Sequence, residues 1–147
     1  MKYKIETYNT DLYSYKNSFK LLVYIIDSCN YNCEYCYNDF PRTNIKLDLN
    51  KLYFFIKNIL IDIHKKDYIW LELIGGEPTL HPDLLDFCQK ISKLNNIYMT
   101  IYTNFSKDID FYKTLLSIDS RISLILSWHS LNKNFKDKFD LIPNIYI

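Results

Sequence analysis

The feature that most constrains the fold is a regular alternation of short apolar runs with segments of helical periodicity. Four runs rich in β-branched and aromatic residues occupy 20–27, 68–74, 97–103 and 121–127. Repeated strand–helix units imply a parallel sheet with right-handed crossovers and helices over its outer face. We therefore predict an α/β fold of about four such units over 20–147, preceded by an N-terminal extension at 1–19.

Polar residues and a proline mark where the intervening helices begin. We expect Asp48 to cap the first helix and Pro82 to open the second, because each suits the start of a helix. A third helix is predicted at 108–118 and a weaker, more polar one at 132–140, and residues 144–147 look like the start of a fifth strand. The first helix carries an apolar stripe made of Leu49, Leu52, Tyr53, Ile56, Ile59, Leu60 and Ile63.

Chemically useful residues follow each predicted strand directly. Folds of this class place their sites at the carboxyl ends of the strands, so these residues should meet at one rim. In chain order they are Cys29, then Gly75, Gly76 and Glu77, then Thr103 and Asn104, and finally Ser127, Trp128 and His129.

Three cysteines, Cys29, Cys33 and Cys36, lie on the loop after the first strand. Thiolates are soft ligands, and three of them so close together can converge on one metal centre. Structural zinc and electron-transfer clusters usually take four protein ligands, so a set of three suggests an open coordination position. The fourth cysteine, Cys88, lies at helical spacing among apolar residues and is expected to be a buried core thiol.

Composition narrows the class of protein further. The 147 residues suit one domain, and 48% of them are apolar. Eighteen basic residues nearly balance seventeen acidic ones without a dense basic block, so the charge gives no reason to expect nucleic acid or a membrane surface as partner. No apolar stretch approaches the roughly 20 residues that span a bilayer, and no apolar signal segment follows Met1. We expect a cytoplasmic protein.

The cysteine spacing, with Tyr35 before Cys36, resembles the signature of the radical S-adenosylmethionine (SAM) superfamily. A second resemblance strengthens the first. The chain has only two glycines, and both stand in the sequence Gly75-Gly76-Glu77-Pro78 after the second strand, which is similar to the Gly-Gly-Glu motif of that family. Glycine tolerates unusual dihedrals and allows close approach to the backbone. Thr103-Asn104-Phe105 is similar to the Thr-Asn-Gly that often ends the third strand in the family, with Phe105 in place of glycine.

The resemblance implies a partial (β/α) barrel that binds a 4Fe–4S cluster and SAM. Cys29, Cys33 and Cys36 would hold the cluster, and Glu77 with the Gly75 and Gly76 backbone would bind the SAM amine. Tyr35 would lie near the adenine, while Asn104 and Ser127 are further SAM-site candidates, with His129 behind Ser127. An electron from a flavodoxin- or ferredoxin-type donor would then cleave SAM to a 5′-deoxyadenosyl radical, which takes hydrogen from a substrate that the sequence does not identify.

Three alternatives stay open at this point. The chain could be a non-catalytic iron–sulfur module, or a zinc module whose fourth ligand is His64, His81 or His129; the cysteines could also bind no metal. The length raises a separate question, because a six-unit partial barrel would need about 180 residues at the size of the units in a full barrel. We expect an incomplete core, either a fragment, a half completed by another chain or C-terminal region, or a remnant.

Overall fold

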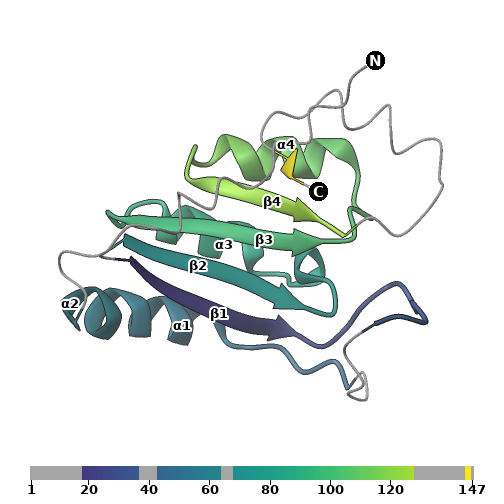
Figure 1. Cartoon of the computed structure of the whole chain (residues 1–147), viewed down its shortest axis with the longest axis horizontal. Coiled ribbons are helices and arrows are strands. Elements are labelled where there is room, and N and C mark those ends of the chain that lie inside the picture. Colours follow the sequence, from purple (N-terminus) through teal and green to yellow (C-terminus); the bar gives the residue numbers. More distant parts are fainter. Residues whose placement is uncertain (1–17, 37–42, 64–67, 128–144, 147) are drawn as a thin grey trace.

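The computed structural model describes residues 18–36, 43–63, 68–127 and 145–146, and its centre is one parallel sheet with strand order β1-β2-β3-β4-β5 (Figure 1). Every strand pairs with the next one along the chain, and all four pairings are parallel. The predicted α/β class is therefore confirmed. The strands are β1 (Ser18–Ile26), β2 (Tyr68–Gly75), β3 (Ile97–Thr103), β4 (Ile122–Leu126) and β5 (Ile145–Tyr146).

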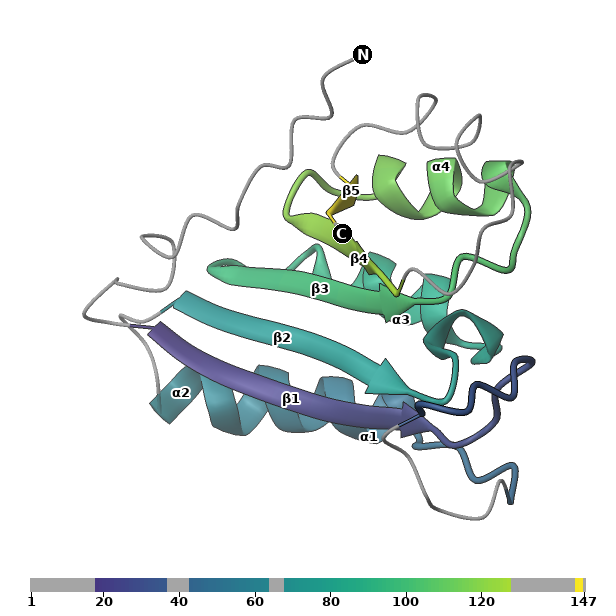
Figure 2. The same cartoon turned by 45° about the vertical axis from the view of Figure 1, so that its right-hand side comes forward.

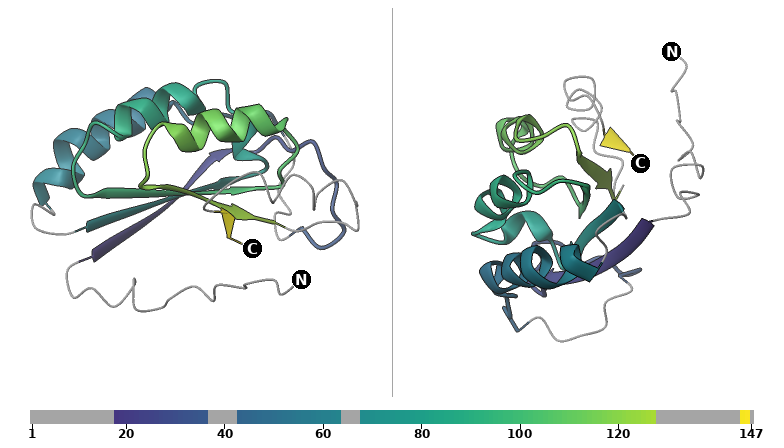
Figure 3. Two further views of the ribbon diagram at one scale, coloured as in Figure 1. Left: turned by 90° about the horizontal axis from the view of Figure 1, so that it is seen from above. Right: turned by 90° about the vertical axis from the view of Figure 1, so that its left-hand side faces the viewer.

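The described helices all lie on one face of this twisted sheet, as both panels of Figure 3 show. Between β1 and β2 one continuous helical segment runs through α1 (Leu49–Phe55), the π-helical turn η2 (Ile56–Leu60) and α2 (Ile61–Ile63). The crossover from β2 to β3 contains the 3-10 turn η3 (Pro78–Leu80) and α3 (Leu84–Ile91), and α4 (Ile109–Ser117) joins β3 to β4. None of the described helices has both the length and the apolar character that a membrane span requires.

The core lies between the sheet and these helices. In β4 the predicted alternation holds, since Ile122, Leu124 and Leu126 are buried and the residues between them are partly exposed. Cys88 of α3 is fully buried and lies 3.6 Å from the Met99 sulfur of β3, which confirms that it is a core thiol. Burial raises the pKa of the Cys88 thiol to about 12, so this thiol stays protonated.

Two details of the predicted helices are wrong. Ile59 and Ile63 were placed in the buried stripe, yet they are 44% and 69% exposed. The π-helical turn supplies the reason: its wider turn rotates the following residues away from the face set by Leu49 and Ile56. Pro82 does not open the second helix either, because α3 begins at Leu84 and Pro82 lies in the turn after η3.

The last described residues extend the sheet. Ile145 and Tyr146 pair in parallel with Leu124 and Ile125, so the predicted fifth strand is confirmed and the edge of β4 is covered over this short length. The weaker helix predicted at 132–140 lies outside the described residues. In Figure 2 the arrowheads of β1 to β3 all point to the same end of the sheet, and the loop after β1 leaves from that end. The predicted rim therefore exists.

Candidate metal centre

The loop that carries the three cysteines has a closed base. Residues 43–47 return beside the end of β1, where Asp27 N donates to Ile45 O (3.1 Å) and Leu47 N donates to Ile25 O (2.9 Å). The Asp27 carboxylate accepts hydrogen bonds from the backbone N–H and the hydroxyl of Thr43. These bonds hold the pKa of Asp27 below its usual 3.8. The loop thus starts and ends at fixed points on the rim.

The three loop cysteines form no disulfide, and all three are partly exposed. Cys36 N donates to Cys33 O (3.1 Å), which closes a tight turn between those two residues, and Tyr31 N donates to the Cys29 sulfur (3.4 Å). Across the part of the chain that the structure describes, no group of three or more His, Cys, Asp or Glu side chains has the geometry to hold a metal ion. The loop brings the three cysteines to one region, but their side chains do not form a site for a single metal ion.

The donor set nevertheless fits an iron–sulfur cluster. A single zinc ion requires all its sulfur ligands at about 2.3 Å. A 4Fe–4S cluster instead takes each cysteine on a different iron atom, so its thiolates are farther apart. Hydrogen-bond donors directed at a ligating sulfur, such as Tyr31 N at Cys29, are typical of the surroundings of such clusters.

Gly75 and Gly76 are required by a close approach of two backbones. Neither has a positive φ, so the expected dihedral freedom is not what glycine provides here. A Cβ on Gly75 would lie 2.3 Å from Ile26 O, and one on Gly76 would lie 2.2 Å from Ser28 O. Gly76 N donates to Ile26 O (2.7 Å) and Glu77 N donates to Ser28 O (2.8 Å), which joins the end of β2 to the start of the cysteine loop.

Glu77 joins the ends of β2 and β3 through its side chain. The carboxylate is buried and accepts four hydrogen bonds. Oε1 accepts from Thr79 N (3.1 Å), Thr79 Oγ1 (2.6 Å) and Thr103 Oγ1 (2.7 Å), and Oε2 accepts from Asn104 N (2.6 Å). Three donors thus share Oε1, whereas Oε2 accepts one hydrogen bond and keeps a lone pair. The predicted contact of Glu77 with the SAM amine would therefore be made at Oε2.

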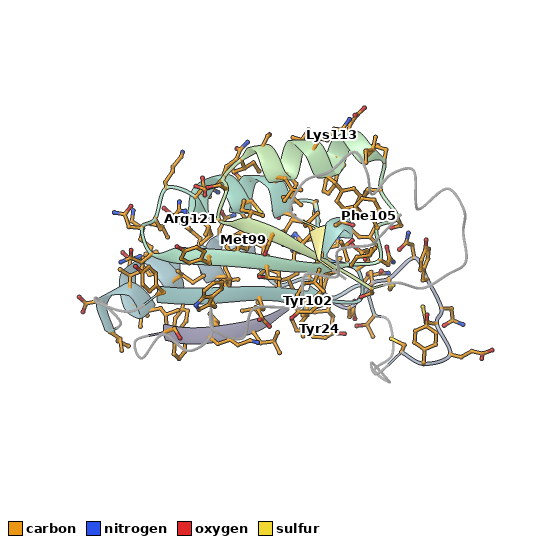
Figure 4. All side chains as sticks on the ribbon, turned by 45° about the horizontal axis from the view of Figure 1, so that its top comes forward. Tyr24, Met99, Tyr102, Phe105, Lys113 and Arg121 are labelled. Atoms are coloured by element: carbon orange, nitrogen blue, oxygen red, sulfur yellow. The ribbon has the colours of Figure 1, made fainter. Side chains whose placement is uncertain are left out.

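Asn104 connects the hydrogen bonds around Glu77 to the cysteine loop. Its side-chain Nδ2 lies 2.9 Å from Asn30 Oδ1 and 3.7 Å from the Cys29 sulfur. The next residue, Phe105, has a left-handed φ of 58°, the kind of dihedral that favours glycine. Phe105 is buried and stacks on Tyr112 of α4 with ring centroids 4.0 Å apart, and Figure 4 shows it at the carboxyl end of the sheet. The turn keeps its glycine-like shape although the residue is not glycine.

Two further predicted site residues, Ser127 and Tyr35, lie outside the hydrogen bonds that join Glu77 and Asn104. Ser127 follows β4, and its N–H donates to Thr103 O (2.9 Å), which places it beside the end of β3. Tyr35 lies on the cysteine loop with its side chain 66% exposed. Local desolvation and then the neighbouring Cys33 thiol raise the pKa of Tyr35 above its usual 10.0. Their predicted contacts with SAM stay predictions.

One histidine proposed as a zinc ligand, His81, already forms hydrogen bonds within the protein through both ring nitrogens. His81 is buried, its Nδ1 accepts from Asp83 N (3.2 Å), and its Nε2 therefore donates to Leu47 O (2.9 Å). Both ring nitrogens are used within the protein, so His81 is not a candidate ligand. His64 and His129 lie outside the described residues.

The sequence prediction missed two residues that build the rim, Thr79 and Asn30, and it missed the bond made by Thr103, which it had placed at the rim. Thr79 and Thr103 donate to Glu77, and Asn30 accepts from Asn104. A signal for Thr79 was present: Glu77 precedes Pro78 as a helix N-cap does, and an N-cap side chain accepts from the N–H two or three residues later. Nothing local marks Asn30 or the bond from Thr103 to Glu77, because both contacts are made between different strand ends.

The family model of the radical SAM superfamily matches residues 23–140, and this chain belongs to that superfamily. The matched segment contains the cysteine loop, the Gly-Gly-Glu turn and the end of β3. Membership assigns to the chain the cofactors that its members use, a 4Fe–4S cluster and SAM. The parallel sheet and helices described above are consistent with a partial radical SAM barrel.

The chain resembles proteins named GTP 3′,8-cyclase. It is 29% identical over 80 residues to the enzyme of Microcystis aeruginosa, covering 51% of this chain and 23% of that protein. It is 30% identical over 82 residues to the enzyme of Acaryochloris marina (52% and 24%), and 34% identical over 93 residues to a probable one of Thermoplasma volcanium (62% and 27%). The match thus spans about a quarter of each relative. No solved structure gives a significant match.

Proposed function

We propose that this chain is the cluster- and SAM-binding part of a radical SAM enzyme. The observation that carries the proposal is the hydrogen-bonded connection of three motifs at one rim. Glu77 N donates to Ser28 O at the start of the cysteine loop, Glu77 Oε2 accepts from Asn104 N, and Asn104 Nδ2 approaches the Cys29 sulfur. A structural metal module needs the cysteines but has no need of this arrangement around them.

In the proposed enzyme, separate residues bind the cluster and SAM. The thiolates of Cys29, Cys33 and Cys36 bind the cluster, and the backbone at Gly75 and Gly76, with Glu77 behind it, binds the SAM amine. The buried negative charge of Glu77 favours a cationic amine nearby even though protein donors occupy its oxygen atoms. Tyr35 and Ser127 are proposed to contact the adenosine and methionine parts of SAM.

When bound, these cofactors supply reductive cleavage of SAM and removal of a hydrogen atom from substrate. The chain's residues position SAM beside the cluster and limit the access of water. We propose a cytoplasmic enzyme that receives electrons from a flavodoxin- or ferredoxin-type protein and whose barrel is completed by further chain or by a partner. Because the relatives are GTP 3′,8-cyclases, GTP is the first substrate to test.

The test is anaerobic reconstitution followed by SAM titration. We expect about four irons per chain, as a 4Fe–4S cluster requires. The variant Cys33→Ala should lose this iron. The control variant Cys88→Ala should keep it, because the Cys88 thiol is buried in the core. Addition of SAM should then change the electron paramagnetic resonance (EPR) spectrum of the reduced cluster. Stoichiometric zinc without iron uptake would refute the proposal, and an iron-loaded protein that ignores SAM would favour the non-catalytic module.

A further inference from the structure

The side chain of Asn104 is almost completely buried at the rim, with only 4% of the residue exposed. Its backbone N–H donates to Glu77 Oε2 at 2.6 Å, and its Oδ1 accepts from Ser106 N at 3.1 Å. A backbone N–H can only donate, so Ser106 fixes Oδ1 on its own side and leaves the NH₂ group facing the cysteine loop. The orientation of this amide is therefore determined by the hydrogen-bond network.

The NH₂ group has two protons and two acceptors within reach. Asn30 Oδ1 lies at 2.9 Å and the Cys29 sulfur at 3.7 Å, a normal length for a hydrogen bond to sulfur. Tyr31 N supplies a second donor to the same sulfur at 3.4 Å. Cys29 thus receives hydrogen bonds from two directions, one from its own loop and one from the end of β3.

Hydrogen bonds to a ligating sulfur withdraw electron density from it. They stabilise the reduced, more negative state of a cluster and raise its reduction potential. The effect is larger for a buried donor, because little water is present to screen it. Of the two donors, Asn104 is the one that a side-chain substitution can remove.

We propose that Asn104 is a positioning residue that donates a hydrogen bond to the cluster-ligating sulfur of Cys29 and thereby raises the reduction potential of the cluster. The inference rests on the proposed function, since it requires that Cys29 is a ligand. It gives Asn104 a role toward the cluster, distinct from the contact with SAM predicted for it. Because Glu77 holds the backbone of Asn104, the Gly-Gly-Glu turn is connected to the cluster through this residue.

The test compares three reconstituted proteins without SAM, by redox titration followed by EPR. Asn104→Asp keeps an acceptor for Ser106 N but loses the donor and adds negative charge, so its potential should shift to more negative values. The matched control, Asn30→Ala, removes the other partner of the same NH₂ group and leaves the donor to Cys29 in place. Its potential should stay at the wild-type value.

A second measurement covers the case in which Asn104→Asp does not retain its cluster. Wild-type protein labelled with ¹⁵N at asparagine side chains should show a ¹⁵N coupling to the reduced cluster in pulsed EPR, and the coupling should persist in Asn30→Ala. A normal cluster with an unchanged potential in Asn104→Asp, or an absent coupling in the wild type, would overturn the inference. Failure of the wild type to take up iron would instead refute the proposed function itself.

Discussion

Replacing Glu77 with glutamine tests how the ends of β2 and β3 are held together. Two of the four donors to this carboxylate are backbone N–H groups, of Thr79 and Asn104, whose directions the chain fixes. A glutamine has one acceptor oxygen and one NH₂ group, so one of these N–H groups must face another donor. The threonine hydroxyls can rotate, whereas the N–H groups cannot.

The magnitude follows from this count. One buried N–H without an acceptor costs about 1–3 kcal/mol, and the three remaining bonds weaken because they lose their charged partner. The smaller desolvation cost of a neutral amide offsets part of that loss. We expect Glu77→Gln to lower the free energy of unfolding by about 2–4 kcal/mol, a large part of the 5–15 kcal/mol typical of a domain.

Glu72 provides a matched control in β2. It is also a buried glutamate, but its partners are the Lys20 ammonium (2.7 Å) and the Tyr102 hydroxyl (3.3 Å), both on side chains that can turn away. Lys20 is half exposed, so water can solvate its charge. We expect Glu72→Gln to cost about 1 kcal/mol or less, because an exposed partner contributes little.

The assay is urea unfolding followed by far-UV circular dichroism, with the slope of the transition checked to be equal in all three proteins. A loss in Glu77→Gln that does not exceed the loss in Glu72→Gln would show that the fixed N–H donors are not what makes Glu77 important.

Three further outcomes are expected. Gly76→Ala should destabilise the fold by about 2–4 kcal/mol and lower iron uptake, because its Cβ would meet Ser28 O at 2.2 Å; urea unfolding and iron analysis check this, and wild-type behaviour would contradict it. Iodoacetamide should alkylate the three loop cysteines of the folded apoprotein and spare Cys88, as mass spectrometry of the intact chain would show; a fourth adduct before unfolding would contradict its burial. The bidentate hydrogen bonds from Arg121 hold the pKa of Asp119 below 3.8, so this pair stabilises the fold above that pH and stops doing so as the pH falls through the folded pKa. The stability difference between wild type and Asp119→Asn, about 1–2 kcal/mol near neutral pH, should therefore shrink below about pH 4 in urea titrations, and a difference independent of pH would contradict the assignment.

The strands and their order were predictable because the signals are local and strong. Ile97–Thr103 was predicted with its observed bounds, and the other strand limits differ by at most a few residues. The sequence also indicated which residues meet at the rim, since parallel strands bring their carboxyl ends together. The direction in which side chains of the first helix face was harder to predict. No sequence signal indicated the π-helical turn that rotates Ile59 away from the core.

The connections within the site could not be predicted in the same way. The need for glycine at 75 and 76 was foreseen, but the reason is contact with the backbone of the β1 end, which depends on tertiary structure. The bonds from Thr103 and Asn104 to Glu77 join residues 26 and 27 positions apart, and no periodicity encodes them. The sequence placed the candidate site residues at one rim, and the structure shows the hydrogen bonds that join them.

Phe105 shows how a turn can keep a glycine-like shape without a glycine. A left-handed φ costs a bulky residue of the order of 1–2 kcal/mol, and burial of the ring against Tyr112 is large enough to offset that cost. What the turn after β3 requires is therefore a dihedral angle, and glycine is only the most common way to reach it. Searches for distant homologues that score glycine at this position will undervalue chains of this kind. A search that scores the backbone conformation together with an aromatic partner on the following helix would recover them.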